Sequence, residues 1–510
     1  MTDLRALVVD SSRRHSLGGV AVAVVGTGEQ TAIECLGLAD RAGGRPVAAD
    51  TVFRIASVSK TLTAIGLMQL RDEGLFNLDD AVNGYLKRFQ IKAPRGAPEV
   101  TFRHLLTHTA GIGELPKVSD VVRREAWGAG GPMAPAADLA ELYGGTLRSD
   151  VAAGSKWAYA NHGFAVLGQL VEDLAGDSFP DHMRERVLQP LGMAHTDYLR
   201  TERVADELAV GYHWILNRFR PVKDYDLILL GPGSVLSSLR DMISYAAWLL
   251  DGGDRNGDVL APRTLSEMMS PQFSVDPRIT TAMGLAFFLD YLGRHRVCGH
   301  DGNMPGFASA LLVAPDDGVG VVVLSNTSTF IGAHLLPASV LRSVLGVPDP
   351  ASMLPRSDVP ARPHTWSELT GYYAPRPGFL TNFRVWQVLC GEVEVFIRGR
   401  RLLIRALSPL GQLRHGTELH PTDAADPFLF AVCIEGLVVP VAFGADDAGR
   451  ADSLCIGAPA TATLYRRPVW RSSRRRFLAV AAAGLAGAAM KHARRTSGMP
   501  PVSEPISARS

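Results

Sequence analysis

Five prolines fall within sixteen residues, about two thirds of the way along the chain: Pro348, Pro350, Pro355, Pro360 and Pro363. Proline fixes φ and removes a backbone donor, so neither a helix interior nor a central strand runs through such a segment. We interpret residues 348–363 as a linker, because a chain of 510 residues is long enough for two domains. The sequence thus predicts one domain over 1–347, a second over 364–470, and a tail over 471–510.

The patterns on the two sides of this linker differ. Before it, apolar residues recur at helical spacing after Lys60 as far as Gly74, and again from Phe164 to Leu174. Paired apolar runs with turns between them predict two hairpins. These are Val20 to Val25 with Thr31 to Leu38, and Ala308 to Val313 with Val319 to Leu324. After the linker the short apolar runs are those of strands, which predicts a small β domain over 364–470.

Charge and motif content exclude several functions. The net charge of +1 gives no overall attraction to nucleic acid, so we expect no nucleic-acid partner. Five scattered cysteines without a Cys-x-x-Cys pair argue against a zinc site, and no phosphate-binding glycine motif occurs. We therefore expect no metal and no cofactor. The first residues do not resemble an export signal, which predicts a cytoplasmic protein.

The tail has a composition of its own. Arg474, Arg475 and Arg476 precede an uncharged apolar run from Phe477 to Met490. The run has 14 residues, whereas a membrane-spanning helix needs about 20. We interpret residues 471–495 as a possible site of membrane contact rather than a span.

Ser57 and Lys60 form the one Ser-x-x-Lys sequence in the chain, at the predicted start of the first helix. Residues three apart share a helix face, so the amine is placed beside the hydroxyl. A lysine whose pKa is lowered by desolvation is able to take the proton of a serine nucleophile. The alternative reading is a capping serine next to a solvated lysine.

Two further segments carry suitable groups. Tyr159 and Asn161 lie just before the helix predicted from about Gly163, where a tyrosine is able to share a proton with a lysine. His300, with Asp301 and Gly302, is read as a loop histidine before a strand; it is able to donate a hydrogen bond, and the glycine permits close approach. Each segment taken alone is also compatible with a purely structural role.

The three segments occur in the order Ser-x-x-Lys, Tyr-x-Asn, His-x-Gly, about 100 and 140 residues apart. In this order and spacing the chain resembles the superfamily of class C β-lactamases and D-alanyl-D-alanine peptidases, which includes esterases and D-aminopeptidases. Four other segments add to the resemblance, which covers residues 5–345: Phe53 to Ala56, His104 to Gly111, Pro190 to Met193, and Met283 to Phe287.

The resemblance implies an α+β fold, in which an antiparallel sheet is flanked by helices and faces an all-helical lobe across the active site. It implies that Ser57 forms an acyl-enzyme with Lys60 and Tyr159 as the proton-transfer pair. His300 is a further catalytic candidate. Substrate binding is expected from Asn161, from Gly302 and from Asn303, whose backbone N–H would complete an oxyanion hole with that of Ser57. The small β domain resembles accessory domains of such hydrolases.

The third segment departs from the pattern of many β-lactamases, which carry lysine and a hydroxyl residue where this chain has His300 and Asp301. Those groups help to bind the carboxylate of the antibiotic. We therefore expect a serine hydrolase that acts on small ester, amide or peptide substrates, as a carboxylesterase or D-aminopeptidase does. The alternatives are a β-lactamase or D-alanyl-D-alanine carboxypeptidase, and a catalytically inactive ligand-binding protein.

Overall fold

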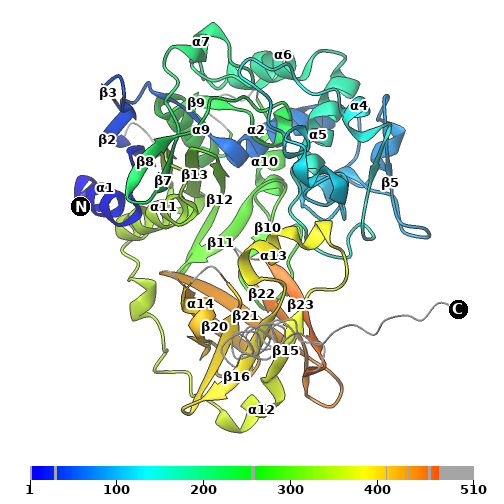
Figure 1. Cartoon of the computed structure of the whole chain (residues 1–510), viewed down its shortest axis with the longest axis vertical. Helices are drawn as coiled ribbons and strands as arrows, with labels where there is room; N and C mark the ends of the chain where they lie inside the picture. The colour runs from blue at the N-terminus through cyan, green and yellow to red at the C-terminus, as the bar shows by residue number, and fades with distance from the viewer. Residues whose placement is uncertain are drawn as a thin grey trace, which may run out of the picture.

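The computed structural model describes residues 3–27, 31–253, 259–408, 411–434, 436–457 and 461–469. Two large antiparallel sheets dominate it, and they follow one another along the long axis of the molecule, the first in the upper half of Figure 1 and the second in the lower half. The first sheet and its helices use residues up to Leu345, and the second begins at Gly371. The C-terminal tail, with the predicted membrane contact over 471–495, lies outside the described residues.

The first sheet has eight strands in the order β10-β11-β12-β13-β14-β1-β2-β3. Their bounds are Ala282–Met283, Phe288–Leu292, His295–Met304, Phe307–Ala314, Val319–Ser325, Gly19–Gly26, Thr31–Asp40 and Arg45–Pro46. The central strands β1 and β14 are buried on both faces, because helices cover the sheet on both sides. The covering helices are α1 (Leu4–His15), α11 (Phe330–Leu345) and α9 (Leu239–Leu250).

A helical lobe lies beside this sheet, and its two longest helices carry residues of the predicted site. These are α2 (Ser59–Asp72) and α5 (Asn161–Ala175), which pack against each other. Shorter helices complete the lobe: α3 (Phe102–Leu106), α4 (Leu139–Tyr143), α6 (Phe179–Met183), α7 (Glu202–Ala205), α8 (Leu230–Gly233) and α10 (Pro262–Met268). Three pairs of short strands link the parts: β4 (Val52–Arg54) with β9 (Leu236–Ser238), β5 (Gln90–Lys92) with β6 (Thr146–Arg148), and β7 (Tyr212–Ile215) with β8 (Arg218–Pro221).

The second sheet has nine strands in the order β18-β17-β16-β15-β23-β22-β21-β20-β19. Their bounds are Thr417–Glu418, Arg401–Ala406, Val393–Arg398, Gly371–Ala374, Ala462–Arg467, Ala451–Ile456, Leu437–Ala445, Leu429–Ile434 and His420–Pro421. The two edge strands β18 and β19 are neighbours in the chain, so the sheet curls into a nearly closed barrel around its own apolar core. Three helices belong to this part: α12 (Trp366–Leu369), α13 (Phe383–Leu389) and α14 (Gly411–His415).

The expected α+β fold is confirmed, and so are both hairpins, as β1–β2 and β13–β14. The helix after Lys60 and the strand-rich C-terminal region are also present. One local assignment was wrong: His300 lies within strand β12, which pairs on both sides, and not in a loop. No helix among the described residues is long and apolar enough to cross a membrane.

Candidate active site

Ser57 lies in a single 3-10 turn, Ala56–Val58, between strand β4 and helix α2. The turn is tight: Ala56 has a φ of +47°, which is strained for a residue with a Cβ, and Ser59 Oγ donates to the Ala56 carbonyl at 2.6 Å. Strand β12 passes directly beneath, because a Cβ on Gly302 would lie 2.4 Å from the Ile55 carbonyl oxygen. The close approach that Gly302 permits is therefore to the turn that holds Ser57.

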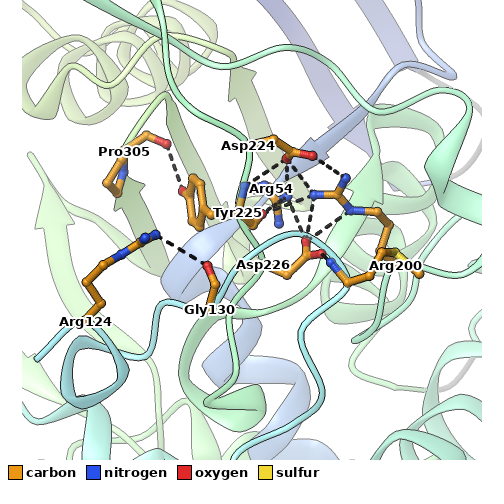
Figure 2. A network of polar contacts seen from close by, with 9 residues as sticks. Arg54, Arg124, Gly130, Arg200, Asp224, Tyr225, Asp226 and Pro305 are labelled. Atoms are coloured by element: carbon orange, nitrogen blue, oxygen red, sulfur yellow. Dashed lines mark hydrogen bonds and ion pairs between the residues drawn. The ribbon is translucent and has the colours of Figure 1, made fainter.

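A buried ion-pair network fixes the strand that leads into this turn (Figure 2). The guanidinium of Arg54 donates to Asp226 at 2.9 Å, and Arg200 donates to the same carboxylate. The neighbouring Tyr225 donates its hydroxyl to the carbonyl of Pro305 at 2.8 Å, just after β12 ends. The network thus ties β4, which leads into the turn of Ser57, to the end of β12.

Lys60 is fully buried, and its amine has three polar neighbours. Nζ lies 2.9 Å from Ser57 Oγ, 2.9 Å from Asn161 Oδ1 and 2.6 Å from the Pro232 carbonyl oxygen. Burial lowers the pKa of Lys60 well below its ordinary value, and the charge of Arg384 lowers it further. Glu114 and Asp301 oppose this shift because their charges favour the ammonium.

Tyr159 is also buried, and its ring lies 4.8 Å from Lys60 Nζ. Burial raises the pKa of Tyr159, whereas Arg384 and a hydrogen bond with Ser57 act to lower it. His108 stacks on this ring with centroids 4.2 Å apart, and its Nδ1 accepts from the backbone N–H of Ala160 at 3.2 Å. His108 is a site residue to which the sequence assigned no role.

His300 on β12 is buried, with its ring centroid 6.1 Å from that of Tyr159. Its Nδ1 donates to the Asp301 carbonyl at 2.6 Å, while its Nε2 is buried and has no hydrogen-bond partner among the described residues. Burial lowers the pKa of His300 to about 4 although the Asp301 charge raises it, so the ring is neutral at pH 7. Asn303 lies three residues after His300 on the same strand and is exposed.

The sequence also missed two charged residues, Glu114 and Arg384. Asn161 Nδ2 donates to Glu114 Oε1 at 3.1 Å, and Arg384 donates to both oxygens of the same carboxylate, at 3.2 and 3.3 Å. The Arg384 guanidinium also lies 4.0 Å from the centre of the Tyr159 ring. Arg384 belongs to α13 of the C-terminal region, 270 residues from Glu114, and no local sequence pattern indicates such a pairing.

The structure thus gathers Ser57, Lys60, Tyr159, Asn161 and His300 around one point between the sheet and the lobe. Among the described residues, no group of three acidic, histidine or cysteine side chains is arranged to hold a metal ion. The arrangement offers a hydroxyl beside a desolvated amine, which is the setting for nucleophilic catalysis by serine.

Comparison with known proteins places this site in a family. The family model described as Beta-lactamase matches residues 4–343. Penicillin-binding protein 4 of Amycolatopsis lactamdurans is 28% identical over 71% of this chain and 95% of its own length. Esterase EstB of Burkholderia gladioli is 34% identical over 41% of this chain and 54% of its own, and a D-aminopeptidase of Brucella anthropi is 26% identical over 68% and 62%.

Solved structures show the same fold at lower identity. An octameric penicillin-binding protein homologue from Pyrococcus abyssi has a TM-score of 0.59 at 20% identity, and it covers 90% of this chain and 99% of its own. The crystal structure of SurE has a TM-score of 0.59 at 22% identity, and the match covers 91% of this chain and 98% of SurE. Both matches extend over the second sheet as well as the first. With its site geometry and the family match over two thirds of its length, the chain belongs to the β-lactamase family of serine hydrolases.

Proposed function

We propose that Ser57 is the nucleophile of a hydrolase that cleaves small esters or amides, including peptides, through an acyl-enzyme. The observation that carries this proposal is the set of contacts around Lys60. A neutral amine has two N–H groups and one lone pair. The Pro232 carbonyl and Asn161 Oδ1 are acceptors and take the two N–H groups, so the lone pair faces the hydroxyl of Ser57.

The orientation of the Asn161 amide supports this assignment. A carboxylate accepts and does not donate, so the amide nitrogen faces Glu114 and the amide oxygen is left for Lys60. With its pKa well below the ordinary value, Lys60 is available as a neutral base. In the proposed reaction Ser57 Oγ attacks the substrate carbonyl carbon while its proton passes to Lys60 Nζ.

Collapse of the tetrahedral intermediate releases the alcohol or amine, which takes up a proton. Tyr159 is suited to deliver it, because its raised pKa keeps the phenol protonated and it shares a hydrogen bond with Ser57. We assign the oxyanion hole to the backbone N–H groups of Ser57 and Asn303, since β12 packs against the turn of Ser57. Water then hydrolyses the acyl-enzyme by the same proton route in reverse.

A fluorophosphonate probe tests the nucleophile directly. The wild-type protein should be labelled at Ser57 and should hydrolyse p-nitrophenyl esters, and Ser57→Ala should lose both properties. Ser155→Ala is the matched control, because Ser155 is exposed and its hydroxyl contacts only the nearby Ala152 carbonyl among the described residues. Labelling of the Ser57→Ala protein at wild-type level would refute the proposal. Parallel assays with D-amino acid p-nitroanilides would separate amides from esters.

Hydrolysis of β-lactams or D-alanyl-D-alanine peptides is a second candidate. The match to penicillin-binding protein 4 of Amycolatopsis lactamdurans favours it, because that match covers 95% of the relative's length. His300 and Asp301 argue against it, because they present a neutral ring and a negative charge to the carboxylate of a β-lactam or a peptide.

We also propose that residues 471–495 bring the protein to anionic membranes, on the strength of the arginines before Phe477 and the apolar run that follows. Sedimentation with phosphatidylserine vesicles tests this proposal, with a chain ending at Arg471 as the comparison. Equal binding of the two proteins would contradict it. A cytoplasmic location stays a prediction from the sequence.

A further inference from the structure

A segment of the C-terminal region, Gly378–Arg384, lies against the lobe beside the active site. Leu380 packs so closely on Gly113 that a Cβ at Gly113 would lie 2.3 Å from the Leu380 Cβ. The backbone N–H of Glu114 donates to the Leu380 carbonyl at 3.3 Å. The ring of Phe383 lies 5.4 Å from that of Trp127. These contacts hold the segment next to Glu114, whose carboxylate accepts a hydrogen bond from Asn161 in the active site.

Arg384 follows directly and makes the polar contacts of this docking. Its Nε and Nη2 donate to the two oxygens of Glu114, whose side chain is 9% exposed, whereas that of Arg384 is 45% exposed. A two-point contact of this kind fixes the plane of the carboxylate as well as its position. The Glu114 carboxylate is therefore oriented by a residue of helix α13 in the C-terminal region.

A continuous chain of hydrogen bonds leads from this carboxylate to the nucleophile. Glu114 accepts from the Asn161 amide nitrogen, Asn161 Oδ1 contacts Lys60 Nζ, and Nζ contacts Ser57 Oγ. Reversal of the Asn161 amide would present an N–H group to Lys60. The lone pair of Lys60 would then be drawn towards that group and away from Ser57. The orientation of one amide thus decides whether the base faces the nucleophile.

We infer that Arg384 of the C-terminal region is a positioning residue for the hydrolysis: it holds Glu114 in the orientation that fixes the Asn161 amide and so directs Lys60 at Ser57. The inference rests on the proposed function. The active site is therefore complete only when the C-terminal region is docked. Loss of the guanidinium leaves a nearly buried carboxylate without its cation, and such a group turns away or takes up a proton. A protonated Glu114 donates, which favours the reversed amide.

The test compares Arg384→Ala and Arg384→Lys with Arg405→Ala in the full chain. Arg405 is a matched control, because it donates to Glu394 at 2.7 Å and lies 4.2 Å from the Phe396 ring centre, entirely within the second sheet. For a p-nitrophenyl ester, Arg384→Ala should lower kcat about 100-fold, the usual scale for a misplaced catalytic group, with little change in KM. The kcat of Arg384→Lys should lie between those of the wild type and Arg384→Ala, because lysine keeps the charge but loses the two-point contact.

Two further measurements separate positioning from a merely structural role. Methylguanidinium added to Arg384→Ala should restore part of kcat, since the Arg384 side chain is 45% exposed and its removal opens the site to solvent, and it should do nothing for Arg405→Ala. In the Glu114→Gln background, Arg384→Ala should cause a much smaller further loss than in the wild type, because both changes break one chain of contacts.

If Arg384→Ala lowers kcat by the same factor in the Glu114→Gln background as in the wild type, the inference is overturned. An unchanged kcat in Arg384→Ala would also overturn it, as would an effect confined to KM, which would make Arg384 a substrate contact. If Arg384→Ala fails to fold, wild-type kcat in Arg384→Lys would still refute the inference, because the charge alone would then suffice. Failure of the proposed function is distinct, since it appears as labelling away from Ser57.

Discussion

Arg54, three residues before the proposed nucleophile Ser57, donates from its guanidinium to the carboxylate of Asp226 at 2.9 Å, and its side chain is only 4% exposed. Removal of one partner from a buried pair costs about 3–5 kcal/mol, because the other charge stays buried. Arg200 still contacts Asp226, so we expect Arg54→Met to lower the free energy of unfolding by about 3 kcal/mol, the lower end of that range.

Urea unfolding measures this loss of stability when Arg54→Met and the control Arg240→Met are each compared with the wild type. Arg240 pairs with Asp50 at the surface, where both side chains are half exposed, and the cost there should stay below about 1 kcal/mol. Equal midpoints for the two variants would mean that the network in Figure 2 does not stabilise the fold.

Lys60→Ala and Tyr159→Phe should each lower kcat for a p-nitrophenyl ester far more than they change KM. Each removes a proton-transfer group that acts in the transition state, and such groups contribute about 10²–10⁴-fold. Steady-state kinetics give both constants. A raised KM at unchanged kcat would assign either residue to substrate binding instead.

The pH profile should show the lowered pKa of Lys60. Below that pKa the amine is an ammonium and unable to take the Ser57 proton, so kcat/KM should rise with pH and level off well before the ordinary lysine pKa of about 10.4. The charge of Asp301 raises the pKa of Lys60, so Asp301→Asn should move the rise of kcat/KM to lower pH. A profile that still climbs above pH of about 10, or a rise that moves the other way, would contradict the assignment of Lys60 as the base.

Residue spacing made part of this site predictable. Ser57 and Lys60 are three residues apart at a helix start, so helix geometry places them on one face, while Tyr159 stands two residues before α5 begins at Asn161. The helices and hairpins around them follow from apolar periodicity in the same way. The sequence placed His300 in a loop before the strand expected from Ala308, whereas the structure has it on β12, close to Gly302. The structure explains this glycine by the passage of β12 beneath Ile55.

Glu114 and Arg384 could not be predicted, because their relation exists only after docking. The two residues are 270 positions apart, and each stands in a segment with no repeating pattern. The helix that carries Arg384 has seven residues, too short for periodicity to reveal it in a region composed mainly of strands. Their role follows from where the C-terminal region packs, which is a property of the tertiary structure.

The choice between esters and β-lactams depends on charge at strand β12. A penicillin carries a carboxylate next to its scissile amide, and a donor or cation is needed to hold it. His300 supplies no cation at pH 7, because burial lowers its pKa to about 4. Next to it Asp301 acts as a negative charge on Lys60, Tyr159 and Arg384 alike. Arg384, which reaches the site from α13 of the C-terminal region, is already paired with Glu114.

We therefore predict efficient hydrolysis of p-nitrophenyl esters and poor hydrolysis of nitrocefin. Two like charges about 4 Å apart at an effective dielectric of about 20 repel by about 4 kcal/mol, a penalty that neutral esters do not meet. His300→Lys combined with Asp301→Thr removes the repulsion and adds a cation, so the nitrocefin-to-ester ratio of kcat/KM should rise at least about tenfold, equivalent to about 1.4 kcal/mol. Asp301→Asn alone should give part of that rise. A wild-type kcat/KM for nitrocefin that equals the ester value would refute this prediction and favour the β-lactamase alternative.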